Sequence, residues 1–267
     1  MRSGGLLGPR DPRTVSLVNP AGASPFLLIG DHAGRAVPEA LGDLGLLEED
    51  LRRHIAWDIG VRDLGEALAA RLNAVFIAQT WSRLVIDCNR DPDRTDAIPE
   101  VSDGAVIPGN IGLTPEDRAA RIAEVHAPYQ DAIAVELARR AEEGRETVLV
   151  ALHSFTPRMN DFDRPWDAGV LHDGGDLTVA KAMITVMRET PGLTIGDNEP
   201  YKMDGIDHTV PRHAFGAGLA YVELEVRQDH LSSTAGVTLW AGRIESWLRR
   251  AASRERPCGE AGADDRE

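Results

Sequence analysis

The sequence has few cysteines and no long apolar run. Cys88 and Cys258 are the two cysteines among 267 residues, and because Cys258 lies in a polar C-terminal stretch, the pair does not make a disulfide framework. No apolar run approaches the roughly 20 residues that span a bilayer, and residues 1–12 lack the apolar segment of a secretory signal. We therefore expect a soluble, cytoplasmic protein with no membrane partner.

Positive charge is also scarce. Lysine and arginine number 29 against 43 aspartates and glutamates, a formal net charge of −14. This balance argues against nucleic acid or an anionic membrane as a partner. It does not exclude a small acidic substrate, because a local cluster of arginines can overcome the negative field of the whole protein. Solubility alone is enough to explain the excess of acidic residues.

The composition is that of an ordinary globular protein, with 42% hydrophobic and 27% charged residues. The chain shows no internal repeat and no Gly/Ser/Pro linker long enough to separate domains. We expect an N-terminal extension over residues 1–24, lying on the surface, and a single catalytic α/β domain over residues 25–252. Residues 253–267 are polar and are expected to form a disordered tail.

Short apolar runs alternate with amphipathic stretches along the chain. Strands are expected at residues 26–30, 74–78, 83–87, 147–152 and 219–225. Helices are expected at residues 48–72 with a break near Gly60, from Thr114 towards Gly144 with an interruption at Pro128, and at residues 177–189 and 237–251. This alternation predicts an α/β fold whose sheet is largely parallel and covered on both faces.

Polar residues follow several of these strands. In open α/β sheets, ligands bind outside the carboxyl ends of the strands. His32 follows the first strand, His153 follows the strand at 147–152, and Asp87 to Arg90 close the run at 83–87, while Glu223 and Glu225 lie on the strand at 219–225. We therefore expect these side chains to meet at one edge of the sheet.

Two histidines and an aspartate are the candidate metal ligands. A catalytic zinc usually takes three protein ligands and keeps one position for water. His32 and His153 are the first two, and Asp58, beside an apolar helical run, is the third because a buried acid needs a partner. Structural histidines, and a helix cap or surface role for Asp58, are the alternatives. Zinc is expected, although another divalent metal fits the same ligands.

Glu225 is the candidate general base. A carboxylate on a rigid strand beside a metal can take a proton from activated water. An ion pair with Arg227, two residues on, is the competing role. Other schemes lack their motifs, since the chain has no G-x-S-x-G elbow, Walker loop, H-E-x-x-H helix or G-x-G-x-x-G after a strand.

Arginines are the candidate groups for a substrate carboxylate. Arg83, Arg90 and Arg212 could each donate two hydrogen bonds, and Asn89 adds an amide donor beside Arg90. His213 follows Arg212 and could polarise the scissile carbonyl. Surface ion pairs are the alternative role for each arginine.

The sequence also resembles the N-formylglutamate amidohydrolase family. The resemblance covers most of residues 26–247 and rests on separated motifs in a fixed order: Asp31-His32 with the residues to Pro38, Trp57-Asp58, Ser82 to Arg90, His153-Ser154-Phe155, and Val210 to His213 leading to Glu225. It implies a three-layer α/β/α fold of the zinc-carboxypeptidase type, with a mostly parallel or mixed sheet. It also implies a metal-activated water that hydrolyses an N-acyl amino acid.

The resemblance carries roles to matching positions. Asn89-Arg90 is similar to the pair that binds the substrate carboxylate, His153-Ser154-Phe155 to the metal-binding strand, and Glu225 to the base. Enzymes of the zinc-carboxypeptidase type pair a metal histidine with a glutamate three residues later. Arg35 stands there in this chain, which leaves Asp58 as the candidate substitute.

The implied function is a metal-dependent amidohydrolase acting on a small acidic N-formyl or short N-acyl amino acid. A peptidoglycan fragment or small peptide is the alternative substrate, and the loops at 101–112 and 158–175 would decide between them. A domain that binds a ligand without catalysis is a third hypothesis. The sequence does not predict the oligomeric state.

Overall fold

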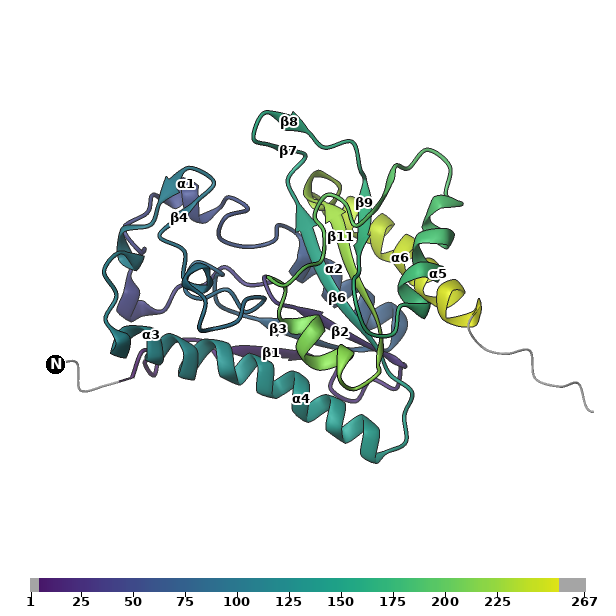
Figure 1. Ribbon diagram of the computed structural model, residues 1–267, viewed down its shortest axis with the longest axis horizontal. Helices are drawn as coiled ribbons and strands as arrows, with labels where there is room; N and C mark the ends of the chain where they lie inside the picture. The colour runs from purple at the N-terminus through teal and green to yellow at the C-terminus, as the bar shows by residue number, and fades with distance from the viewer. Residues whose placement is uncertain (1–4, 255–267) are drawn as a thin grey trace, which may run out of the picture.

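A mixed sheet forms the centre of the molecule. The computed structural model describes residues 5–254, and within them this sheet has seven strands in the order β1-β3-β2-β6-β11-β9-β10 (Figure 1). Their bounds are β1 Val15–Val18, β3 Val75–Gln79, β2 Phe26–Gly30, β6 Val148–Phe155, β11 Ala220–Arg227, β9 Ala168–Leu171 and β10 Ile195–Asp197. The four central strands, β3, β2, β6 and β11, are parallel, whereas β1 and β9 each run antiparallel to their inner neighbour.

Helices cover both faces of this sheet (Figure 1). Helices α2 (Val61–Leu72), α5 (Thr178–Arg188) and α6 (Thr234–Arg254) pack on one face with Leu28 and Phe76, while α4 (Ala127–Glu142) packs on the other with Leu27 and Ile77. Alternate residues of a strand point to opposite faces, so apolar residues at every position require cover on both sides. The predicted three-layer α/β/α class, with a mixed central sheet, is confirmed.

The long helical segment after Thr114 is interrupted where the sequence predicted. Thr114 caps α3 (Pro115–Arg121), accepting a hydrogen bond from the amide of Asp117. A π-helical stretch, Ile122–His126, then joins α3 to α4 just before Pro128. Proline lacks the amide proton and clashes with the preceding turn, and the wider π turn accommodates it.

The expected helix over residues 48–72 is broken before Val61, but the non-helical part is wider than predicted and covers residues 52–60. It consists of a short α1 (Glu48–Leu51) and the later α2, and Gly60 precedes α2 with a φ of 82°. Glycine adopts this left-handed conformation without a steric penalty. The break places Asp58 in the connection, where its side chain turns towards the sheet edge.

Two strand predictions need correction. Residues 83–87 form turns rather than a strand. Ser82 donates its hydroxyl to Ala56 O and accepts from the amide of Leu84, and these local bonds divert the backbone from a sheet. The strand expected at 147–152 continues to Phe155, so His153 lies inside the strand and not after it.

The expected extension over residues 1–24 contains part of the sheet. Residues 15–18 form β1, an edge strand paired antiparallel with β3. At the other end, residues 253–254 belong to α6, and the rest of the expected tail lies outside the described residues. No helix in residues 5–254 is long and apolar enough to cross a membrane.

Short elements connect the main ones. Two small hairpins consist of β4 (Val101–Ser102) with β5 (Ala105–Val106) and β7 (Arg158–Met159) with β8 (Phe162–Asp163). Single turns of 3-10 or π helix lie at Glu39–Leu41, Thr95–Ala97, Pro108–Asn110, Pro211–Phe215 and Gln228–Leu231.

Candidate metal centre and active site

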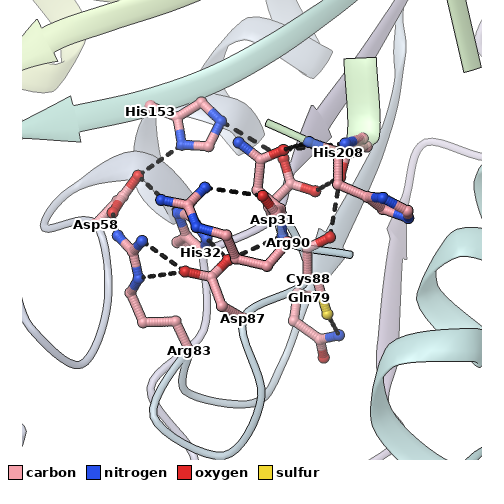
Figure 2. Close-up of polar contacts among 12 residues, drawn as sticks. Asp31, His32, Asp58, Gln79, Arg83, Asp87, Cys88, Arg90, His153 and His208 are labelled. Atoms are coloured by element: carbon pink, nitrogen blue, oxygen red, sulfur yellow. Dashed lines mark hydrogen bonds and ion pairs between the residues drawn. The ribbon is translucent and has the colours of Figure 1, made fainter. Parts of the chain in front are cut away.

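Three buried side chains meet at the carboxyl ends of β2 and β6. His32 follows β2, His153 lies near the end of β6, and Asp58 comes from the loop before α2 (Figure 2). Asp58 Oδ2 is 2.9 Å from His153 Nδ1 and 3.4 Å from His32 Nδ1. One ligand atom from each residue lies within 4.8 Å of the other two. The structure thus brings together the three predicted ligands.

A second carboxylate faces the far nitrogen of each histidine. Asp87 Oδ1 is 2.7 Å from His32 Nε2, and Asp31 Oδ2 is 3.5 Å from His153 Nε2. Metal-binding histidines commonly have such a carboxylate behind them, which fixes the ring orientation and the tautomer. The Nδ1 atoms therefore face Asp58, which is the arrangement a shared ion requires.

The charges around this cluster favour a cation. Burial opposes protonation of His153, yet Asp31 and Asp58 raise its pKa well above the usual value. Burial likewise opposes ionisation of Asp58, yet His32 and His153 lower its pKa. His32 Nδ1 is buried and has no hydrogen-bond partner within residues 5–254. Two imidazoles, one of them with an unpartnered Nδ1, and a carboxylate fit a divalent metal such as zinc.

Arg83 lies beside the cluster and is held by its carboxylates. Its Nε and Nη2 donate to Asp87 Oδ2 at 3.1 and 2.6 Å, and its Nη1 is 3.5 Å from Asp58 Oδ1 (Figure 2). Arg83 was predicted to bind a substrate carboxylate. The structure places Arg83 at the pocket, but its hydrogen-bond donors are already bonded to Asp87 and Asp58.

A pocket of about 500 Å³ opens over the cluster. Its lining includes seven of the nine predicted site residues: His32, Asp58, Arg83, Asn89, Arg90, His153 and Glu225. Strand β11 pairs with β6 so that Glu225 lies opposite His153. The parallel register of these strands therefore sets Glu225 beside the metal ligands.

Glu225 has the properties expected of a base. Burial raises its pKa to about 7, and its Oε2 has no hydrogen-bond partner among the residues described. The competing ion pair with Arg227 is not formed, because Arg227 pairs with Asp229 and Asp167. Glu223, two residues earlier on β11, also lines the pocket, and burial raises its pKa well above the usual value.

Asn89 and Arg90 hold a loop at the pocket wall. Asn89 Oδ1 accepts hydrogen bonds from the amides of His208 and Thr209, and its Nδ2 donates to Asp207 Oδ1 at 3.2 Å. Arg90 Nη1 donates to the carbonyl of Asn89, and it lies 3.9 Å from Asp207 Oδ1. Asp207 thus occupies the position where a substrate carboxylate was expected.

Arg212 and His213 are not brought to the pocket. Arg212 is exposed, and His213 is buried with its Nε2 2.7 Å from Gln130 Oε1. Gln130 on α4 donates to Thr209 Oγ1, which in turn donates to Asp31 Oδ1 at 2.6 Å. The π turn at Pro211–Phe215 packs His213 inwards. His213 therefore reaches Asp31 only through Gln130 and Thr209.

Sequence reasoning placed Asp87 at the sheet edge but assigned neither Asp31 nor Asp87 a role behind the histidines. Both were visible in the motifs, since Asp31 precedes His32 and Asp87 ends the run before Asn89. A histidine pair with two extra aspartates nearby was the available signal. Their pairing with specific ring nitrogens depends on contacts between residues 55 and 122 positions apart, which no local pattern contains.

Known proteins share both the sequence and the fold. A family model described as N-formylglutamate amidohydrolase matches residues 24–232. An N-formylglutamate deformylase from Pseudomonas aeruginosa is 31% identical over 171 residues, covering 57% of this chain and 63% of that protein. The match thus spans less than two thirds of that relative's length.

Solved structures resemble the whole described fold. A gene product from Agrobacterium tumefaciens gives a TM-score of 0.90 at 34% identity, covering 93% of this chain and 98% of that one. An N-formylglutamate amidohydrolase from Ralstonia eutropha gives a TM-score of 0.64 at 21% identity, covering 90% and 99%, a likeness of fold. Because the family match covers most of the chain and includes every predicted site residue, the protein belongs to the N-formylglutamate amidohydrolase family.

Proposed function

We propose that the protein is a metal-dependent amidohydrolase that cleaves a formyl or other short acyl group from an amino acid. The observation that carries this proposal is the cluster of His32, Asp58 and His153 beneath a pocket that Glu225 also lines. Glu225 Oε2 has no hydrogen-bond partner within residues 5–254. Family membership supports hydrolysis of a linear amide C–N bond. The same pocket is the expected site of a small acidic substrate.

Zinc is the expected ion, with another divalent metal as the alternative. When bound, it would polarise the acyl carbonyl and lower the pKa of water. His32, Asp58 and His153 would hold it, and Asp31 and Asp87 would orient the two imidazoles. Glu225 accepts a proton from the attacking water and passes it to the leaving nitrogen, a role suited to a pKa of about 7.

Cations at the pocket would bind the carboxylate of the substrate. Arg83, Arg90 and Lys202 are the cations that line it within residues 5–254. Arg83 is engaged with Asp87, which leaves Arg90 for the α-carboxylate once that group displaces Asp207. Asn89 then acts by holding the loop at residues 207–209, while His213 supports Asp31 through Gln130 and Thr209.

A neutral side chain on the substrate is the second candidate. The side-chain carboxylate of glutamate needs a further cation, and Lys202 is the remaining one of the three, on an exposed loop. Asp96, Asp103 and Asp204 also line the pocket and are exposed. Asp96 and Asp103 are paired with Arg94 and Arg53, so Asp204 is the acid that disfavours a second negative charge. Other N-acyl amino acids, a small peptide or a peptidoglycan fragment therefore remain alternatives.

One experiment tests both the metal dependence and the preference for a charged or neutral substrate side chain. Metal content is measured together with product release from N-formyl-L-glutamate, its neutral isostere N-formyl-L-glutamine, N-acetyl-L-glutamate and a dipeptide. We expect about one metal per chain, loss of activity with a chelator and recovery with zinc. A preference for the glutamine compound over the glutamate compound would support the second candidate.

The proposal fails if the protein holds no stoichiometric metal and hydrolyses none of these compounds. A ligand that survives purification intact, with metal bound and Glu225 unchanged, would instead indicate a binding domain without catalysis.

A further inference from the structure

Arg164 is a buried cation with no carboxylate partner in the described part of the chain. Its side chain lies just after β8 and the residue is 8% exposed. Nη1 donates to Tyr201 Oη at 2.9 Å and to Thr156 O at 3.3 Å, and Nη2 contacts Met159 Sδ at 2.9 Å. Burying a charge without a counter-ion is costly, so a specific use for this guanidinium is expected.

The guanidinium is stacked as well as hydrogen-bonded. Its central carbon lies 4.7 Å from the ring centroid of Tyr201 and 5.8 Å from that of Phe155. Phe155 is the last residue of β6, two positions after the metal-ligand candidate His153. Arg164 therefore ties Tyr201, from a loop at the pocket wall, to the strand that carries the site.

The hydrogen bond fixes the direction of the Tyr201 hydroxyl. Arginine has donors and no acceptor, so Tyr201 Oη must accept in this contact. Its own proton remains available, and no acceptor for it is present among residues 5–254. Tyr201 lines the pocket, so this donor is available to a bound substrate.

Other hydroxyls at the end of β6 have no such proton to offer. Ser154 Oγ donates to Ile59 O at 2.9 Å, and Thr156 Oγ1 donates to Arg158 O at 3.1 Å. Tyr201 also lies within the field of the base, because burial and then the charge of Glu225 raise the pKa of Tyr201. Tyr201 therefore stays protonated at neutral pH, near Glu225, the proposed base that accepts the proton of the water.

We propose that the Tyr201 hydroxyl donates a hydrogen bond to the acyl carbonyl oxygen of the substrate, with Arg164 as the positioning residue. This inference rests on the proposed function. Negative charge grows on that oxygen as water attacks, and a fixed donor stabilises it more in the transition state than in the ground state. The positive charge of Arg164 acts through the hydroxyl, which keeps its proton throughout.

Tyr201→Phe tests the donor, because it removes one oxygen from a residue that is 38% exposed and should leave the fold intact. We expect kcat for an N-formyl amino acid to fall by about 10²-fold. KM should change by less than about threefold, because the bond strengthens mainly in the transition state. Metal content and Tm should match those of the unsubstituted protein.

Arg164→Gln tests the positioning role in a double-mutant cycle. It should lower kcat by roughly tenfold in the unsubstituted protein and by less than about twofold in the Tyr201→Phe background. Arg158→Gln is the matched control, because Arg158 begins the hairpin that Arg164 follows and pairs with the exposed Asp163. We expect it to leave kcat unchanged.

The outcomes separate the inference from the proposed function. An active unsubstituted protein whose Tyr201→Phe variant keeps full kcat, or loses only substrate affinity, overturns the donor role. A further tenfold loss from Arg164→Gln in the Tyr201→Phe background overturns the positioning role. Absence of hydrolysis by the unsubstituted protein with every N-acyl compound would instead contradict the proposed function.

Discussion

Two groups of buried or half-buried histidines lie close together in this protein and have opposite electrostatics. In the first group, His32 and His153 each have two aspartates at their rings, and these aspartates raise the pKa of both histidines against the effect of burial. In the second group, His126, His208 and His213, burial is the leading effect and lowers the pKa of each.

The groups are joined by a short path of hydrogen bonds. His213 contacts Gln130, Gln130 contacts Thr209, and Thr209 contacts Asp31 behind His153. Residue type is therefore no guide to role here. Aspartates in contact with the rings make the first group a site for a cation. In the second group no aspartate of residues 5–254 contacts a ring, and burial together with the charge of Arg212 keeps the histidines neutral.

The largest expected effect is on metal binding by the first group. His153→Ala removes one of three ligands, and we expect metal content to fall to background and hydrolysis to be lost. His208→Gln, from the second group, is the control and should retain both. Metal analysis of the purified variants measures this. Equal metal content in the two variants would show that the first group is not the metal site.

The next effect concerns Glu225, which lies opposite His153 on the neighbouring strand. Glu225→Gln keeps the shape of the side chain but cannot accept a proton, and we expect kcat to fall by about 10²–10⁴-fold. Metal content should be unchanged, because Glu225 is not among the three ligands. A Glu225→Gln variant with normal kcat would show that another group acts as the base.

A smaller effect should come from the carboxylate behind His153. Asp31→Asn retains the shape but weakens the charge facing Nε2, and metal affinity should fall by about 10–100-fold. Competition with a chelator of known affinity measures the change. Thr209→Val, which removes the hydroxyl that donates to Asp31 Oδ1, should have a weaker effect in the same direction. Unchanged affinity in both would mean that Asp31 does not support the site.

The second group predicts a pH effect on stability in the metal-free protein. Burial, followed by the charge of Arg212, lowers the pKa of His213 to about 4. The unfolded chain therefore binds the proton first, and the stability contributed by neutral His213 is complete above pH 6.5 and falls as the pH drops towards 4. Between pH 7 and 5 this amounts to a loss of about 2 kcal/mol.

Denaturant unfolding at the two pH values measures that loss. His213→Gln keeps a donor for Gln130 Oε1 but does not titrate in this range, so its free energy of unfolding should fall by about 2 kcal/mol less between pH 7 and 5. An identical pH dependence in the two proteins would show that His213 does not titrate with a lowered pKa.

Much of the fold could be predicted from local patterns. Continuous apolar runs indicated β2 and β6, and the Thr114 cap with Pro115 marked the start of α3. The run Leu84-Val85-Ile86 failed as a strand because burial alone does not specify sheet pairing. These residues pack in separate apolar clusters beneath the loops, where local hydrogen bonds determine the backbone.

The sequence by itself determined the candidate ligands, since His32, Asp58 and His153 could be selected from their chemistry and from their places relative to strands. Only the tertiary structure decided what surrounds each of them. It paired Arg83 with Asp87, turned His213 away from the pocket and gave Arg164 no counter-ion among the residues described. The physical reason is that charge and hydrogen-bond partners come from segments distant in sequence, and a residue's role follows from those partners.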